Sequence, residues 1–246
     1  MSERFFCEDL SHETAVLSDT EAHHALNVLR LKIGAVIELV DGRGTIATAR
    51  IESTTRRSVE TRIVGRTIVP QAETQQRLTV AAVPPKGDRF KWMIEKLTEL
   101  GVDRFIPLQT TRSVVDPKES RLQKLQATIV SAMKQCGRVF LMHIEPPVDL
   151  PSLLKTTSGS DLEILIAHPP DETTATHGDL SQRQSRPQKE TLILIGPEGG
   201  FTEDEVTQVV NAGGTRISLP GSILRIETAA IALAAIRIHC RSGHTF

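Results

Sequence analysis

The chain has 246 residues, of which 39% are hydrophobic, enough for one large domain or two smaller domains with their own cores. Its formal net charge of −1 does not by itself point to a charged partner, and its three cysteines include no CxxC pair. A disulfide framework and a structural zinc site are therefore disfavoured, and a reducing compartment is favoured. The charged start MSERFFCEDL is atypical of a signal peptide, and no apolar run approaches the ~20 residues of a membrane span. We expect a soluble cytoplasmic protein without a metal.

Residues 1–72 are predicted to form a small β-rich domain. Ser18 and Glu21 have the spacing of a capping box, which predicts a helix after them. Three β-like runs follow, AVIELV, TIATARI and VETRIVG, with Asp41-Gly42 as a turn signal between the first two. This pattern predicts a barrel, closed or partly closed, and small barrels often bind RNA by analogy of fold. The polar, proline-containing segment 69–76 marks the boundary of this domain.

From residue 73 to residue 246, strands and helices alternate. The predicted strands are LTVAAVPP, VDRFIPL, DLEILIAHPP, LILIG and TRISL, and the helices cover residues 87–101, 120–137, a segment from Thr202 onward, and 226–240. This alternation predicts a mostly parallel sheet with helices on both faces, an α/β fold. Residues 171–190 have no apolar pattern and are predicted to form a mobile loop.

The stretch from residue 77 to residue 138 carries a basic surplus. Residues 77–138 contain 12 Lys and Arg against 6 Asp and Glu, which fits one-sided contact with RNA or an ordinary solvated surface. The residues proposed to contact RNA are Lys86, Arg89, Arg112, Lys124, Lys134, Gln135 and Arg138. The residues expected to face the core are Phe90, Trp92, Ile94 and Leu97 in the helix over 87–101 and Leu122, Leu125, Ile129, Met133 and Cys136 in the helix over 120–137.

The stretch LILIGPEGGFTEDEV places a glycine-rich turn between a strand and a helix. It lacks both the G-x-G-x-x-G spacing and the lysine of phosphate-binding loops, and Glu198 stands at its centre. Thr202 and Glu205 form a capping box, so the helix start is already satisfied by side chains. We expect a ligand without phosphate and with a positive charge, to which Gly196, Gly199 and Gly200 give access to the backbone; a plain tight turn is the alternative.

A second loop, LPGSILRIETA at residues 219–229, also follows a strand and opens a helix. That helix is apolar nearly all round, so it is predicted to lie in a core or in a subunit interface. Glu227 is expected to complement the helix dipole with Arg225 as its partner, and Arg225 is the stronger candidate for a functional role.

Together these loops resemble those of the SPOUT methyltransferases, and within them the ribosomal RNA small-subunit methyltransferase E family. The resemblance covers nearly the whole chain. It includes IGPEGGF and ILR-x-ETA, RFF at 4–6, H-x-x-x-VLR-x-x-x-G from His24 to Gly34, EKLTELGVDRFIPL at 95–108 and TRSVV at 111–115. The chain departs from the family pattern at 219–222, where an arginine is absent, and at Lys134-Gln135.

The resemblance implies a PUA-like β-barrel over 1–72 and a SPOUT domain with a C-terminal trefoil knot over 73–246, in a homodimer. It implies methylation of N3 of a uridine in 16S rRNA, with the 30S subunit as the expected substrate and S-adenosylmethionine as the cofactor. The implied cofactor-binding residues are Gly196, Pro197, Glu198, Gly199, Gly200, Leu219, Ile223, Leu224, Arg225 and Thr228. Arg225 and Glu198 are the catalytic candidates; Glu198, Glu227 and solvent all stay open as the base. The alternatives are a SPOUT enzyme acting on tRNA or another rRNA position, and a non-catalytic RNA-binding module.

Overall fold

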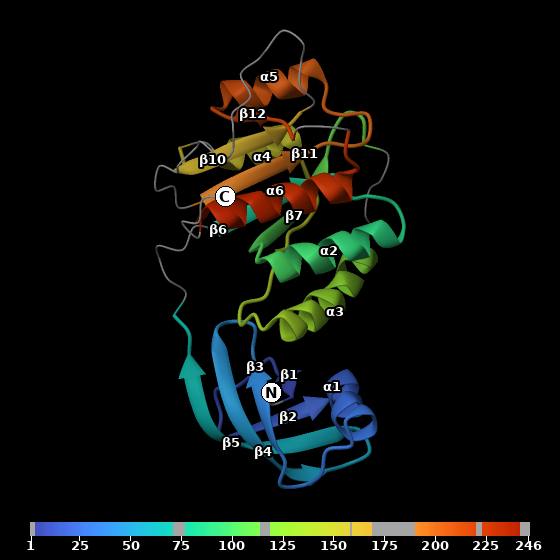
Figure 1. Cartoon of the computed structure of the whole chain (residues 1–246), viewed down its shortest axis with the longest axis vertical. Coiled ribbons are helices and arrows are strands. Elements are labelled where there is room, and N and C mark those ends of the chain that lie inside the picture. The colour runs from blue at the N-terminus through green and yellow to red at the C-terminus, as the bar shows by residue number, and fades with distance from the viewer. Residues whose placement is uncertain are drawn as a thin grey trace. The chain divides into compact units, whose positions relative to one another are not determined.

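The structure is a computed structural model, and it describes residues 3–70, 77–113, 119–157, 159–168, 190–219 and 223–241. Contacts divide the chain into two compact units (Figure 1). Unit 1 comprises Met1–Glu73 with Val130–Leu141, and unit 2 comprises Thr74–Ile129 with Met142–Phe246. The loop predicted over 171–190 lies outside the described residues, apart from Glu190.

Unit 1 contains a five-stranded sheet that confirms the three predicted β runs. Its order is β1 (Arg4–Phe6), β3 (Val36–Val40), β4 (Thr45–Thr54), β5 (Ser58–Ile68), β2 (Thr14–Ser18). The pairs β3–β4 and β4–β5 are antiparallel, whereas β1 joins β3 in parallel. Ala47, Ala49 and Ile51 of β4 are buried at alternate positions, as a strand with one face on a core requires.

The helical segment of unit 1 differs from the prediction at its start. It comprises α1 (Asp19–His23) and a π-helical turn, η1 (His24–Val28). Ser18 makes no side-chain capping bond, so the predicted capping box is wrong. The Glu21 carboxylate instead accepts a hydrogen bond from the Phe6 backbone at 3.1 Å and pairs with Lys134.

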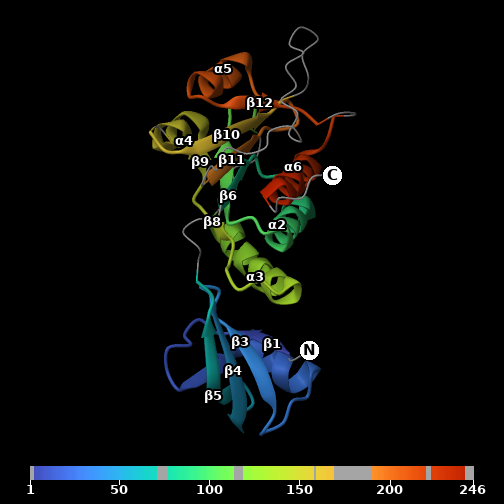
Figure 2. The same cartoon turned by 60° about the vertical axis from the view of Figure 1, so that its left-hand side comes forward.

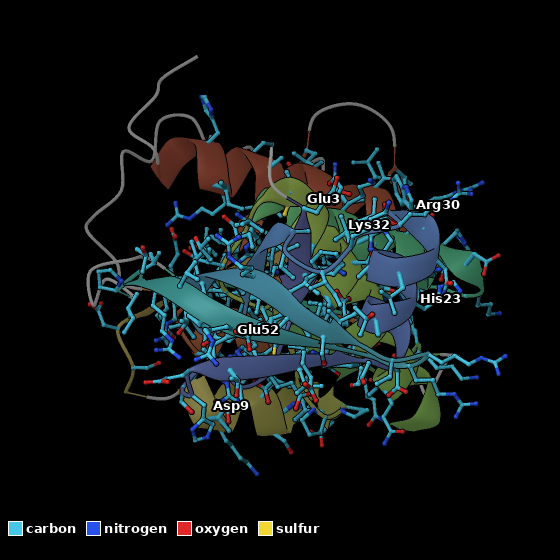
Figure 3. The ribbon with its side chains drawn as sticks, turned by 90° about the horizontal axis from the view of Figure 1, so that it is seen from below. Glu3, Asp9, His23, Arg30, Lys32 and Glu52 are labelled. Atoms are coloured by element: carbon cyan, nitrogen blue, oxygen red, sulfur yellow. The ribbon has the colours of Figure 1, made fainter. Side chains whose placement is uncertain are left out.

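The residues after η1 project two cations outward. Leu29 and Leu31 pack against the core of unit 1, so Arg30 between them is exposed, with a left-handed φ of +54°. Lys32 is also exposed, and Figure 3 shows both residues on the side of unit 1 that carries His23. A left-handed φ on a residue other than glycine costs free energy, which makes this turn a place to look for function.

Unit 2 is built on a parallel sheet in the order β12, β10, β11, β6, β7, β8, with β9 paired to β7. The strands are β6 (Arg77–Ala82), β7 (Arg104–Gln109), β8 (His143–Ile144), β9 (Val148–Asp149), β10 (Leu162–Ala167), β11 (Glu190–Ile195) and β12 (Thr215–Ile217). The central strands β6 and β11 are buried on both faces, which explains why their sequences are predominantly apolar. The predicted α/β fold is confirmed; the trefoil knot stays a prediction.

Helices cover both faces of this sheet, as predicted (Figure 2). On one side lie α4 (Leu150–Thr157) and α5 (Glu203–Asn211), and on the other α2 (Asp88–Leu100) and α6 (Ile226–Arg241). Leu192 and Leu194 of β11 join the core cluster of α4 and α5. The Thr191 side chain points to the opposite face of the sheet from Leu192, and it accepts a 3.0 Å hydrogen bond from Arg237 on α6. Neither α4 nor the short strands β1, β2, β8 and β9 were predicted.

The helix faces were predicted in part. Phe90, Ile94 and Leu97 of α2 are buried as expected, but Trp92 is 46% exposed because it points away from that stripe. In α3 (Glu119–Cys136) the expected core position Cys136 is exposed, since the helix ends there. Within the described parts of the chain, no helix has the length and apolar character needed to cross a membrane.

Candidate active site

A pocket of about 330 Å³ lies where β10, β11 and β12 end, the edge at which parallel sheets bind ligands. Eight predicted cofactor residues line it: Gly196, Pro197, Glu198, Gly199, Gly200, Leu219, Ile223 and Leu224. Eight others that were not predicted complete the lining: Ala167, His168, Ile195, Ile217, Ser218, Ile226, Ala229 and Leu233. His168 follows β10 directly, so the rule that ligands meet strand ends was the signal that could have found it.

Two predicted site residues do not line this pocket. Arg225 and Thr228 are exposed at the start of α6, outside its lining. Among the residues that the structure describes, the Arg225 side chain forms no hydrogen bond or ion pair. A role for Arg225 therefore requires a group that is not part of the described chain.

The glycine-rich turn has internal reasons for its glycines. The Gly200 amide donates to the Pro197 carbonyl at 2.8 Å, and Gly200 has a left-handed φ of +67°. A side chain at Gly196 would meet the Phe201 ring at 3.0 Å. Packing and turn geometry therefore explain Gly196 and Gly200 without a ligand, whereas the sequence had suggested access to the backbone.

The loop after β7 holds this turn and the start of α5. Arg112 donates a 2.6 Å hydrogen bond to the Gly199 carbonyl. The Thr111 backbone and hydroxyl donate to Glu205 at 2.8 and 3.0 Å. The predicted capping box of Thr202 and Glu205 is confirmed, with both of its bonds formed.

Glu205 is buried, with 6% of its surface exposed. Burial alone would raise its pKa, but hydrogen bonds from the Thr111 and Thr202 backbones, reinforced by their hydroxyls, lower the pKa below its usual value. The ionised Glu205 carboxylate therefore connects the loop after β7 to the start of α5 through hydrogen bonds.

Arg89 of α2 lies between two carboxylates. Its Nη1 is 3.5 Å from Oε1 of Glu227, and its Nη2 is 3.9 Å from Oε1 of Glu198. The partner of Glu227 is therefore Arg89, and the expected pairing with Arg225 is wrong. Glu198 is 59% exposed, whereas the Glu227 side chain is only 5% exposed.

The residues proposed to contact RNA fall into two groups. Lys86, Lys124 and Gln135 are exposed. The others have partners within the chain: Arg89 with two glutamates, Arg112 with Gly199, Lys134 with Glu21, and Arg138 with partners of its own. Several of the basic side chains of residues 77–138 thus contact other parts of the chain and not only solvent.

The pocket suits a flat, cationic ligand without phosphate. Among its described lining residues Glu198 is the single formal charge, and no Lys or Arg is among them. Ile223 is 88% exposed and Leu224 38%, so one wall presents bare apolar surface that a ligand's ring would cover. The residues fit a sulfonium-bearing nucleoside better than a nucleotide. No cluster of His, Cys, Asp or Glu suited to a metal occurs in the described ranges.

Comparison with known proteins identifies the class to which this fold and pocket belong. The model of the RNA methyltransferase domain matches residues 72–237, and the model of the RNA methyltransferase PUA domain matches residues 17–64. The protein is an RNA methyltransferase with a PUA domain in its amino-terminal part.

The particular family follows from full-length relatives. Ribosomal RNA small subunit methyltransferase E of Bacillus subtilis is 31% identical, over 91% of this chain and 89% of its own. The Mycobacterium bovis protein of the same name is 29% identical, over 91% and 86%. The crystal structure of the Neisseria gonorrhoeae enzyme bound to S-adenosylmethionine has a TM-score of 0.78 at 28% identity, covering 96% of each chain. This chain belongs to the ribosomal RNA small subunit methyltransferase E family, as its motifs predicted.

Proposed function

We propose that this protein methylates N3 of one uridine in the 16S rRNA of the small ribosomal subunit, using S-adenosylmethionine. The observation that carries the proposal is the pocket itself, in which Glu198 is the single charge among the described lining residues and apolar side chains form one open wall. S-adenosylmethionine supplies an electrophilic methyl group on a positively charged sulfur. The name of the relatives supports the RNA, and the Neisseria gonorrhoeae complex supports the cofactor.

The two loops divide the work in this proposal. The turn from Gly196 to Gly200 and the apolar Leu219, Ile223 and Leu224 hold the adenosine. Uridine N3 carries a proton and becomes nucleophilic when that proton leaves, so Glu198 at the pocket wall is the proposed acceptor. Negative charge then develops on O2 and O4, and its stabilisation is assigned in this proposal to the exposed Arg225.

RNA contact is assigned to exposed cations of both units. In unit 1 these are Arg30 and Lys32, and in unit 2 they are Lys86 and Lys124. Such contacts to phosphate position the RNA and make its binding sensitive to salt. The domain boundaries in this proposal are 1–72 for the PUA-like domain and 73–246 for the methyltransferase domain, and the place of action is the cytoplasm, where the 30S subunit is the substrate.

The proposal includes a homodimer. On α6 the apolar Ile231, Ile236 and Ile238 remain half-buried in the single chain, so part of this helix is available to a second subunit. Light scattering of the purified protein tests this element, and a monomer at micromolar concentration would contradict it.

The direct test incubates the protein with labelled S-adenosylmethionine and 30S subunits that carry unmodified 16S rRNA, followed by mapping of the methylated atom. We expect one methyl group, at N3 of a uridine. Methylation of tRNA or of another atom would replace the proposed substrate. Absence of S-adenosylhomocysteine binding in calorimetry would instead favour a non-catalytic RNA-binding module.

A further inference from the structure

The feature that carries a further inference is Arg89, which the sequence assigned to RNA phosphates. The structure places it beside the pocket, where it is the ion-pair partner of both Glu198 and Glu227. The three residues come from separate elements: the first turn of α2, the glycine-rich turn and the first turn of α6. Because these elements are distant in sequence, the fold of unit 2 brings the three side chains together.

Glu227 is the fixed end of this cluster. Its side chain is 5% exposed, and its Oε1 lies 3.5 Å from Nη1 of Arg89. Its Oε2 is buried and has no hydrogen-bond partner among the described residues. A buried carboxylate of this kind depends strongly on the cation beside it, so Glu227 holds the Arg89 guanidinium in place.

Glu198 is the loose end. At 3.9 Å from Nη2 it lies within reach of the Arg89 charge but beyond hydrogen-bond distance, and it is 59% exposed. The guanidinium therefore attracts this pocket-lining carboxylate and leaves its oxygens free of a hydrogen bond from Arg89. A carboxylate that is oriented but not satisfied is suited to accept a proton from a ligand.

We propose that Arg89, anchored by Glu227, is a positioning residue that holds the Glu198 carboxylate at the pocket mouth for the proton of uridine N3. The inference rests on the proposed function and deepens it. The N3–H bond breaks and the proton bonds to a carboxylate oxygen of Glu198. The electron pair left on N3 forms the bond to the methyl carbon, and the pair of the breaking carbon–sulfur bond goes to sulfur, leaving a neutral thioether.

The test compares Arg89→Gln with Arg89→Lys and with Lys91→Gln, which removes an exposed cation from the same helix. We expect Arg89→Gln to lower kcat on 30S subunits about tenfold or more, while KM and the affinity for S-adenosylhomocysteine change less than about threefold. Arg89→Lys keeps the charge beside Glu227 and should recover part of kcat, and Lys91→Gln should match the original protein. If Arg89→Gln does not fold, Arg89→Lys carries the test, with kcat lowered about threefold or more and affinity retained.

A phosphate contact would behave differently. Loss of Arg89 would then raise KM and flatten its dependence on salt while kcat stayed unchanged, and this result would overturn the inference. Glu227→Gln supplies the second arm. Because Glu227 acts through Arg89, the double variant Arg89→Gln/Glu227→Gln should be no slower than Arg89→Gln alone, and losses that multiply would also overturn it.

Failure of the inference is distinguishable from failure of the proposed function. Unaltered protein that methylates no RNA overturns both. Unaltered protein that methylates 30S subunits beside an Arg89→Gln variant with full kcat overturns the inference alone.

Discussion

Helices α5 and α6 both begin beside the pocket and bury a glutamate in their first turn, but they satisfy the two carboxylates differently. Glu205 on α5 accepts hydrogen bonds from the backbone and hydroxyl of both Thr111 and Thr202. Glu227 on α6 has Arg89 at 3.5 Å, and its second oxygen has no partner among the described residues. The two residues are almost equally buried, at 6% and 4% exposure.

The difference indicates that Glu205 has a structural role, whereas Glu227 keeps one oxygen able to accept a further hydrogen bond. Glu205 exchanges water for four protein donors, so its burial is compensated and it stabilises the turn. An unsatisfied buried oxygen costs free energy, and such costs persist at sites where function requires them. The start of α5 is therefore expected to respond to substitution through stability, and the start of α6 through activity.

The largest expected effect is that of Glu205→Ala. Removal of this carboxylate leaves four donors of Thr111 and Thr202 without their acceptor in partly buried hydrogen bonds, and we expect a loss of about 3 kcal/mol in the free energy of unfolding. Urea unfolding measures it. Glu203→Ala, at an exposed position of the same helical turn, is the matched control and should cost less than about 0.5 kcal/mol. Equal losses of unfolding free energy in the two variants would show that the hydrogen bonds of Glu205 do not stabilise the protein.

The second prediction concerns how Glu205 makes the free energy of unfolding depend on pH, and its expected effect is somewhat smaller than that of Glu205→Ala. Its pKa is lowered from the ordinary value of 4.5, so its contribution is present above that value and is lost as pH falls through the folded pKa. Near neutral pH we expect the free energy of unfolding of the unaltered protein to be about 2 kcal/mol larger than that of Glu205→Gln. This difference should become smaller as the pH falls below about 4.5. Unfolding curves over a pH series test this, with Glu203→Gln as the control. A gap that widens in acid would contradict it.

Arg112→Ala should loosen the glycine-rich turn without unfolding the protein. Its guanidinium donates to the Gly199 carbonyl at 2.6 Å, but the contact is exposed, so its contribution is modest. We expect the affinity for S-adenosylhomocysteine to fall about fivefold, equivalent to about 1 kcal/mol. Lys124→Ala, which removes an exposed cation from α3, should leave that affinity unchanged. The same affinity in both variants would return Arg112 to the group of RNA contacts.

Periodicity and the family motifs were sufficient for the fold class, and for half of the residues that line the pocket. Predominantly apolar runs predicted the central strands because both faces of β6 and β11 are buried, and even their threonines, Thr79 and Thr191, are buried. The capping box at Thr202 and Glu205 was found because both of its partners are local in sequence. The matching pattern at Ser18 and Glu21 failed because partners distant in sequence, Phe6 and Lys134, occupy the Glu21 carboxylate.

The residues that sequence reasoning misplaced are those whose partners lie on other elements. Arg89 is separated from Glu198 and Glu227 by more than a hundred positions, so no local spacing joins it to them. Its positive charge was visible in the sequence, but its partners were not. His168 and Ile217 line the pocket only because β10 and β12 end at the same edge of the sheet, and strand order is not written in the local pattern.

The smallest expected effect, that of Gly200→Ala, tests whether the glycine-rich turn serves the ligand or only its own geometry. Gly200 and Gly213 have left-handed φ angles of +67° and +87°, and a side chain at either would meet no atom within 4 Å. Alanine should therefore cost about 1 kcal/mol of stability at both positions, through backbone strain alone. Only Gly200 lines the pocket, whereas Gly213 follows the end of α5. If a ligand lies against the turn, calorimetry should show weaker S-adenosylhomocysteine binding for Gly200→Ala and unchanged binding for Gly213→Ala, whereas equal affinities would assign Gly200 to turn geometry alone.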